Sequence, residues 1–249
     1  MNVALPLATA LVLMAGGLIQ SVAGFGFGLF ALPLLLFLGR PLPEAVILVI
    51  LASALQKTAG IARLRRDVPW SEMVPLMGVG LAMLFPGILL LRFVSGLGPR
   101  WVKMILGFCI LVLLGLRRFR ARGGRDGTAR AWGYVAAGVS GLLNGFANIG
   151  GPPMVLWVLS RPWPGPRIRG SLFAFSMVFV PFQLIVMGVV FGNVIWQIVL
   201  EFLWLSPAVL LGTLAGLRLG NRVSLPGLRT VMQLMLIAVA MSAVVSPLL

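Results

Sequence analysis

The chain has 249 residues, of which 60% are hydrophobic and only 10% charged, far below the roughly 25% of charged residues in a soluble domain. Its formal charge of +15 occurs without a nucleic-acid-binding motif, so we attribute the basic residues to the loops of a membrane protein and expect no nucleic-acid partner. The sequence has no histidine, and its five carboxylates are scattered. The usual groups for hydrolytic and redox chemistry are therefore missing, and we expect no enzyme, no catalytic or metal site and no cofactor.

Apolar segments of about 17 to 25 residues, each able to cross a hydrocarbon core of roughly 30 Å, recur along the whole chain. They predict an all-α integral membrane protein that lies in a lipid bilayer. Six segments are expected to be ordinary spans: Glu44–Leu64, Met73–Leu91, Val102–Leu116, Ser171–Val190, Ile198–Leu217 and Val231–Val245. The opening segment, Met1–Gly17, lacks the basic start of a signal peptide and is assigned to the membrane body. The single cysteine, Cys109, excludes an intrachain disulfide.

Two further apolar segments are interrupted. Val3–Leu38 is too long for one span and contains three alternating glycines, Gly24, Gly26 and Gly28. Trp132–Leu159 contains two glycines followed by two prolines, within Asn148–Pro153. Neither pattern continues an α-helix without a substantial cost. We therefore expect each segment to be a broken helix or a helical hairpin.

The two interruptions occupy matching places in an internal repeat. Gln20–Gly26 aligns with Asn144–Gly150 at an offset of 124 residues. The other correspondences are Arg40–Pro43 with Arg161–Pro164, Trp70 with Trp196, and Arg92 with Arg218. Four correspondences in the same order along the chain predict a duplication.

The basic residues decide the orientation of the two halves. If each broken segment crossed the membrane once, ten basic residues would lie on each side. If each is a hairpin that returns to its starting side, only Arg40, Arg92, Arg100 and Lys103 lie outside. The sixteen on the inside are then Lys57, Arg63, Arg65, Arg66, Arg117, Arg118, Arg120, Arg122, Arg125, Arg130, Arg161, Arg167, Arg169, Arg218, Arg222 and Arg229. The positive-inside rule favours the hairpins.

The predicted fold is therefore two inverted repeats, each a broken-helix hairpin plus three transmembrane helices. Residues 1–120 form the first membrane repeat, 121–130 the cytoplasmic linker and 131–249 the second repeat. Both termini face outward in this arrangement.

Paired Gly/Pro interruptions in inverted repeats are typical of transporter binding sites. A half-helix that begins at a break directs free N–H groups and its positive dipole end at the cavity, which favours an anion. We expect the glycines to let a ligand approach the backbone and the polar neighbours to donate hydrogen bonds. The candidate substrate-binding residues are Gln20, Ser21, Gly24, Gly26, Gly28, Asn144, Asn148, Gly150, Gly151 and Pro152.

Other readings of these residues stay open. Glycines also let membrane helices pack closely, and Gly212, Gly216 and Gly220 are assigned to such a packing face. Gln56, Ser176 and Gln183 lie within spans, where they would either line the cavity or bond a neighbouring helix. Lys57 is expected to reach the inner membrane surface, and Glu201 to lie at the interface. Arg169 would either attract an anion or set the topology.

The residues Gln20–Gly28 with Pro33, and Ser140–Gly145 leading to Gly150–Pro153, resemble the two repeat signatures of the sulfite exporter TauE/SafE family. The resemblance extends over essentially the whole chain. It implies a multi-pass transporter of sulfite, organosulfonates or related anions in the bacterial inner membrane.

Secondary transport of a small anionic substrate, in the direction of export, is therefore the expected function. The alternative is a membrane scaffold or accessory subunit for a partner protein, in which the breaks would be packing features. The sequence leaves a homo-oligomer open.

Overall fold

The computed structural model describes residues 4–23, 26–98, 100–102, 104–105, 108–109 and 126–219. In this part of the chain all regular structure is helical and no strand is present. The helices of the first half are α1 (Ala4–Ala23), α2 (Phe27–Phe37), α3 (Leu42–Leu64) and α4 (Trp70–Ser95). Those of the second half are α6 (Asp126–Ala147), α7 (Gly151–Leu159), α8 (Gly165–Phe191) and α9 (Val194–Leu219).

Each expected span that lies in the described residues is a single helix. Glu44–Leu64 lies in α3, Met73–Leu91 in α4, Ser171–Val190 in α8 and Ile198–Leu217 in α9. Most of Val102–Leu116 and all of Val231–Val245 lie outside the described residues. Among the described residues, three helical segments are long and apolar enough to cross a membrane: Trp70–Ser95, Gly170–Phe191 and Val194–Gly216. The described part of the chain is thus all-helical, as predicted, and its helices suit a membrane protein.

The repeated Arg-Pro-x-Pro sequence has the same structural role in both halves. It follows the short helix, α2 or α7, and ends where the long helix, α3 or α8, begins. Pro41 precedes the first residue of α3 and Pro164 precedes that of α8, and a further proline lies in each first turn. Proline suits the start of a helix because the N–H it lacks would have no partner there.

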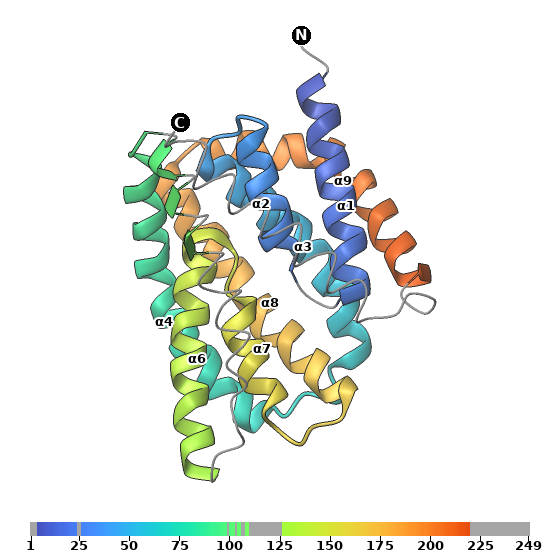
Figure 1. Ribbon diagram of the computed structural model, residues 1–249, viewed down its shortest axis with the longest axis vertical. Helices are drawn as coiled ribbons and strands as arrows, with labels where there is room; N and C mark the ends of the chain where they lie inside the picture. Colours follow the sequence, from blue (N-terminus) through green and yellow to red (C-terminus); the bar gives the residue numbers. More distant parts are fainter. Residues whose placement is uncertain are drawn as a thin grey trace.

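Both interrupted segments form helical hairpins. The chain after α2 returns to the start of α1, where Arg40 Nη2 lies 3.5 Å from Thr9 Oγ1. Likewise α7 returns along α6, because a Cβ added at Gly133 would meet the indole of Trp157. Figure 1 shows the open end of the α1–α2 hairpin at the top of the molecule and that of the α6–α7 hairpin at the bottom.

Close glycine contacts join the two halves. Helix α4 packs against α6, and α1 packs against α9. A Cβ at Gly141 of α6 would collide with the backbone of Gly80 in α4, and one at Gly212 of α9 would collide with the carbonyl of Met14 in α1. A Cβ at Gly216 would likewise collide with the carbonyl of Leu18. The assignment of Gly212 and Gly216 to a packing face is therefore confirmed, while Gly220 lies outside the described residues.

The centre and the surface of the bundle are both apolar. The residues of α3 from Ala45 to Ile50 have no exposed surface. On the outer faces, Trp204 is 88% exposed and Val189 is 82% exposed. Such large exposed apolar faces suit contact with lipid rather than with water.

Candidate substrate cavity between the two broken segments

The second break is made by Asn148 at the end of α6. Its backbone has φ 53°, and Asn is one of the few residues other than Gly that adopts this left-handed conformation at a helix end. The N–H of Asn148 donates to the carbonyl of Asn144 at 2.9 Å, and that of Ile149 donates to the carbonyl of Leu143 at 3.3 Å. These bonds close the last turn of α6 and satisfy the carbonyls of Leu143 and Asn144.

The first break has a different chemistry. Gly26, with φ 101°, caps the N-terminus of α2, and its carbonyl accepts from the N–H of Phe30 at 3.0 Å. The first turn of α2 contains no proline, whereas the first turn of α7 contains Pro152 and Pro153. Helix α2 therefore directs more backbone N–H groups into the interior than α7 does.

The two breaks touch each other. A Cβ added at Gly28 would collide with the carbonyl oxygen of Asn148, so only glycine permits this approach. The side chain of Asn148 extends the contact, because its Nδ2 donates to Ser53 Oγ of α3 at 3.1 Å. One residue of the second break thus bonds the central helix of the first half.

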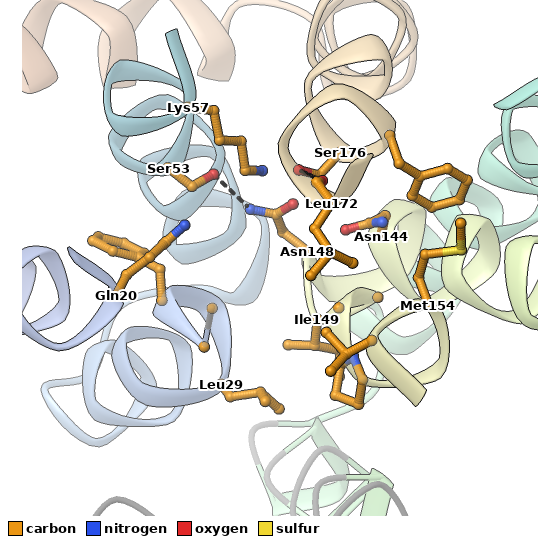
Figure 2. Close-up of a pocket in the computed structure, with 18 of the residues that line it drawn as sticks. Gln20, Leu29, Ser53, Lys57, Asn144, Asn148, Ile149, Met154, Leu172 and Ser176 are labelled. Atoms are coloured by element: carbon orange, nitrogen blue, oxygen red, sulfur yellow. Dashed lines mark hydrogen bonds between the residues drawn. The ribbon is translucent and has the colours of Figure 1, made fainter. Parts of the chain in front are cut away.

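A cavity of about 70 Å³ lies where the breaks meet. Since one water molecule needs roughly 10–15 Å³, the cavity has room for about five to seven water molecules or for a small ligand of that size. Figure 2 shows that both halves contribute to it. The described lining residues are Gln20, Gly26, Phe27, Gly28, Leu29, Ser53, Lys57, Asn144, Asn148, Ile149, Gly150, Gly151, Pro152, Met154, Val155, Leu172, Phe173, Phe175 and Ser176.

Most of the residues selected from the sequence lie at this cavity. Of the ten candidates, the lining includes Gln20, Gly26, Gly28, Asn144, Asn148, Gly150, Gly151 and Pro152. Ser21 lies elsewhere, with its Cβ against Gly216 of α9. Gly24 lies outside the described residues.

The two central glycines of the second break have different surroundings. A Cβ at Gly150 would collide with the carbonyl of Ser140 and with the Asn144 side chain, so this glycine permits the packing of α7 on α6. A Cβ at Gly151 would meet nothing within 4 Å. Open space beside the backbone, which we expected at both glycines, is found at Gly151.

The cavity also contains polar groups from α3 and α8. Ser53 and Ser176 line it from these two helices. Gln183 is not among the lining residues, but it holds one of them in place, because its Nε2 donates to the carbonyl of Asn144 at 2.6 Å. Gln56 bonds Thr213 of α9 at 2.8 Å and so serves helix packing. Of the span residues left open by the sequence, Ser176 therefore lines the cavity, whereas Gln56 and Gln183 bond neighbouring helices.

Lys57 is the residue that sequence reasoning misplaced. Its side chain does not extend to the membrane surface but lines the cavity and is only 7% exposed. It lies one turn after Ser53 on the same face of α3, so both side chains point inward. The spacing of four residues indicates this position in the sequence, because it places Lys57 on the helix face of Ser53 rather than with the basic residues at the end of the span.

Of the two charged residues left open by the sequence, Glu201 has a structural partner. Glu201 accepts from both terminal nitrogens of Arg40, one of them at 2.9 Å. It lies at the end of the bundle where α2 joins α3, which agrees with the expected interfacial position. The side chain of Arg169 lies outside the described part of the chain.

The lining chemistry favours a small anion. The lining residues that are described include no acidic residue and one basic residue, Lys57, together with amides, serine hydroxyls and the start of two helices. No cluster of three metal-ligating side chains occurs among the described residues.

Comparison with known proteins identifies one family. The family model of the sulfite exporter TauE/SafE matches residues 8–243, which is nearly the whole chain. No curated protein and no solved structure matches the chain closely enough to be called a relative.

Proposed function

The chain belongs to the sulfite exporter TauE/SafE family, whose members are transporters, and we propose that it exports sulfite, an organosulfonate or a related small anion across the bacterial inner membrane. One observation carries the choice of an anion. The cavity lies where α2 and α7 begin, so the positive ends of two helices meet at one place, with most of the free N–H groups supplied by α2.

The size of the cavity is consistent with such a substrate. A volume of about 70 Å³ suits a compact oxyanion or a sulfonate with a short organic part. The apolar part of the lining, which includes Leu29, Ile149 and Leu172, would contact that organic part. The proposed binding residues are the eight sequence candidates that line the cavity, together with Ser53 and Ser176.

We further propose that the halves 1–120 and 131–249 are inverted repeats joined by a cytoplasmic linker at 121–130. The opposite directions of the α1–α2 and α6–α7 hairpins in Figure 1 support this. The packing of α4 on α6 and of α1 on α9 also supports it, because exchanging the halves turns one contact into the other. Rocking of such halves about a central site is the usual way for transporters to alternate access.

Export follows from the membrane potential. An inside-negative potential drives an anion outward with about 2.3 kcal/mol per charge for each 100 mV. A simple carrier for sulfite would therefore remove it from the cytoplasm without a further energy source.

An anion-panel flux assay tests this function. Purified protein in liposomes should move sulfite or a small sulfonate such as sulfoacetate, and should leave a cation and a neutral sugar behind. Liposomes without protein give the background. If none of the anions moves although the protein is folded and inserted, transport is refuted, and a scaffold for a partner protein becomes the better account.

A further inference from the structure

Lys57 places a positive charge in the interior without a partner. Among the described residues it makes no hydrogen bond and no ion pair, and 7% of its surface is exposed. Among the other partly covered cations that the structure describes, Arg40 and Arg161 each contact a carboxylate, and Arg167 lies over the ring of Trp163. Lys57 differs from these three in that none of the described residues pairs with its charge.

An unpaired charge in the interior is expensive. Removing a charged amine from water costs several kcal/mol unless a counter-charge or several hydrogen bonds replace the lost hydration. Met, Leu or Gln would fill the same position without that cost. A negatively charged group that enters the cavity would remove this energetic disadvantage.

The neighbouring side chains are arranged to complete such a site. Figure 2 shows the amine of Lys57 and the amides of Gln20 and Asn148 directed toward the same space. Gln20 is 6% exposed, and its Oε1 has no hydrogen-bond partner among the described residues. Its side-chain nitrogen points toward Ser53 and Asn148 in Figure 2, so Gln20 is able to present its NH₂ group to an oxyanion.

The charge comes from one half of the chain alone. At an offset of 123 residues, Ser53 of α3 corresponds to Ser176 of α8, and both line the cavity. The same offset aligns Lys57 with Val180, which is buried and apolar. The cavity is therefore charged on the α3 side and has no charged residue among its described lining from α8.

We propose that Lys57 is the residue that binds the negative charge of the transported anion, with the Gln20 and Asn148 amides as further donors. This inference rests on the proposed transport function and assigns its substrate recognition to one residue. The anionic head lies against α3, and the remainder of the substrate extends toward Leu172 and Phe175 of α8. The bound ligand is an oxyanion, and Lys57 offsets one of its negative charges.

Lys57→Met tests the inference because it keeps the length and volume of the side chain and removes the charge. The variant protein without ligand should melt at a higher temperature than the wild type, since an unpaired buried charge has been removed. Sulfite and sulfoacetate should no longer raise its melting point. Their affinity should fall about ten- to a hundredfold, the factor expected for the loss of a charge-assisted hydrogen bond. Lys57→Arg should retain part of the response.

Two controls separate the charge of Lys57 from other effects. Arg92→Met removes one positive charge from an exposed site on α4 and should leave affinity unchanged. In a Cys109→Ala background, Lys57→Cys should lose flux. Reaction with 2-bromoethylamine, which rebuilds a lysine-like side chain through a thioether, should restore it, whereas the neutral product of iodoacetamide should not.

The outcomes distinguish this inference from the function on which it rests. If Lys57→Met transports sulfite and sulfoacetate with unchanged affinity, the role of Lys57 is refuted while transport stands. A lower melting point of ligand-free Lys57→Met, together with no rescue by 2-bromoethylamine, would assign Lys57 a structural role and also refute the inference. If the wild-type protein moves no anion, the transport function itself fails.

Discussion

Arg161 donates to the carboxylate of Glu72 at 2.8 Å, joining the segment after α7 to the first turn of α4. A matching ion pair joins Arg40, after α2, to Glu201 of α9. Figure 1 shows the α7–α8 and α2–α3 connections at opposite ends of the bundle. At each end of the molecule, an ion pair therefore joins the two halves.

We expect Glu201→Gln to lower the melting temperature in detergent more than Glu72→Gln does. The side chain of Arg40 is 9% exposed and that of Arg161 is 21% exposed, so Arg40 loses more when its partner is removed. The cost should be about 1–3 kcal/mol at Glu201 and about 1 kcal/mol or less at Glu72. Glu44→Gln is the control and should have the smallest effect, because Glu44 is 3.4 Å from Arg40. An equal loss for all three variants would contradict this ranking.

Cysteine labelling should report the inverted topology. In a Cys109→Ala background, Asp67→Cys, between α3 and α4, should react only from the cytoplasmic side. Asn193→Cys, between α8 and α9, should react with an impermeant maleimide from outside. Both residues are exposed, so absence of labelling would reflect sidedness rather than burial. Labelling of both from the same side would support the parallel arrangement in which each broken segment crosses once.

Gly151→Leu should abolish transport without unfolding the protein. A Cβ added at Gly151 would meet nothing within 4 Å, and Gly151 lines the cavity, so leucine would extend into the space of the substrate. Gly78→Leu is the matched control, because Gly78 is also a helical, exposed glycine with nothing within 4 Å but does not line the cavity. Flux and melting temperature should be measured for both. Equal flux in the two variants would show that the substrate does not pass beside Gly151.

Asn148 provides both the left-handed backbone at the end of α6 and the side-chain bond to Ser53, and different substitutions should separate these two roles. Asn148→Gly keeps the left-handed backbone but loses the bond to Ser53, so it should weaken anion binding with little loss of stability. Asn148→Leu also loses the bond and adds the strain of a branched residue at φ 53°, about 1–2 kcal/mol. The leucine variant should therefore melt at a lower temperature than the glycine variant. If both melt alike, the strain at this helix end is smaller than we infer.

The helices and the breaks could be predicted because local chemistry determines them. Alternating glycines and the Gly-Gly-Pro-Pro sequence interrupt a helix in any surroundings, and the structure ends or begins helices there. Eight of the ten candidate residues lie at the cavity for the same reason: they are the residues of the breaks themselves.

The remaining features depend on contacts between distant residues. The bond from Asn148 to Ser53 joins residues 95 positions apart, and nothing local indicates it. Lys57 was counted with the basic residues of the inner loop because a charge near the end of a span commonly reaches the surface. Its direction is instead set by the face of α3 that packs against the breaks. Gly150 was likewise assigned to ligand approach, although the space beside it is filled by α6.

The unpaired charge of Lys57 also predicts how transport depends on the anion outside. With an anion bound, the positive charge of Lys57 has a counter-charge; after release, closing the cavity would bury the positive charge alone, at a cost of several kcal/mol. Return of the empty carrier should therefore be slow, and return with an external anion fast. Efflux of sulfoacetate from loaded liposomes should be several times faster with sulfoacetate outside than with impermeant gluconate, at matched ionic strength and with the membrane potential clamped.

Lys57→Met supplies the internal comparison for this effect. At internal concentrations high enough to load the weakened site, efflux from Lys57→Met liposomes should be insensitive to the external anion, because no charge has to be buried on return. Arg92→Met should keep the wild-type dependence, since its charge lies on the exposed surface of α4. If external sulfoacetate leaves wild-type efflux unchanged, closure of the empty carrier is not limited by Lys57. The buried charge would then be compensated by water or by residues outside the cavity lining described above.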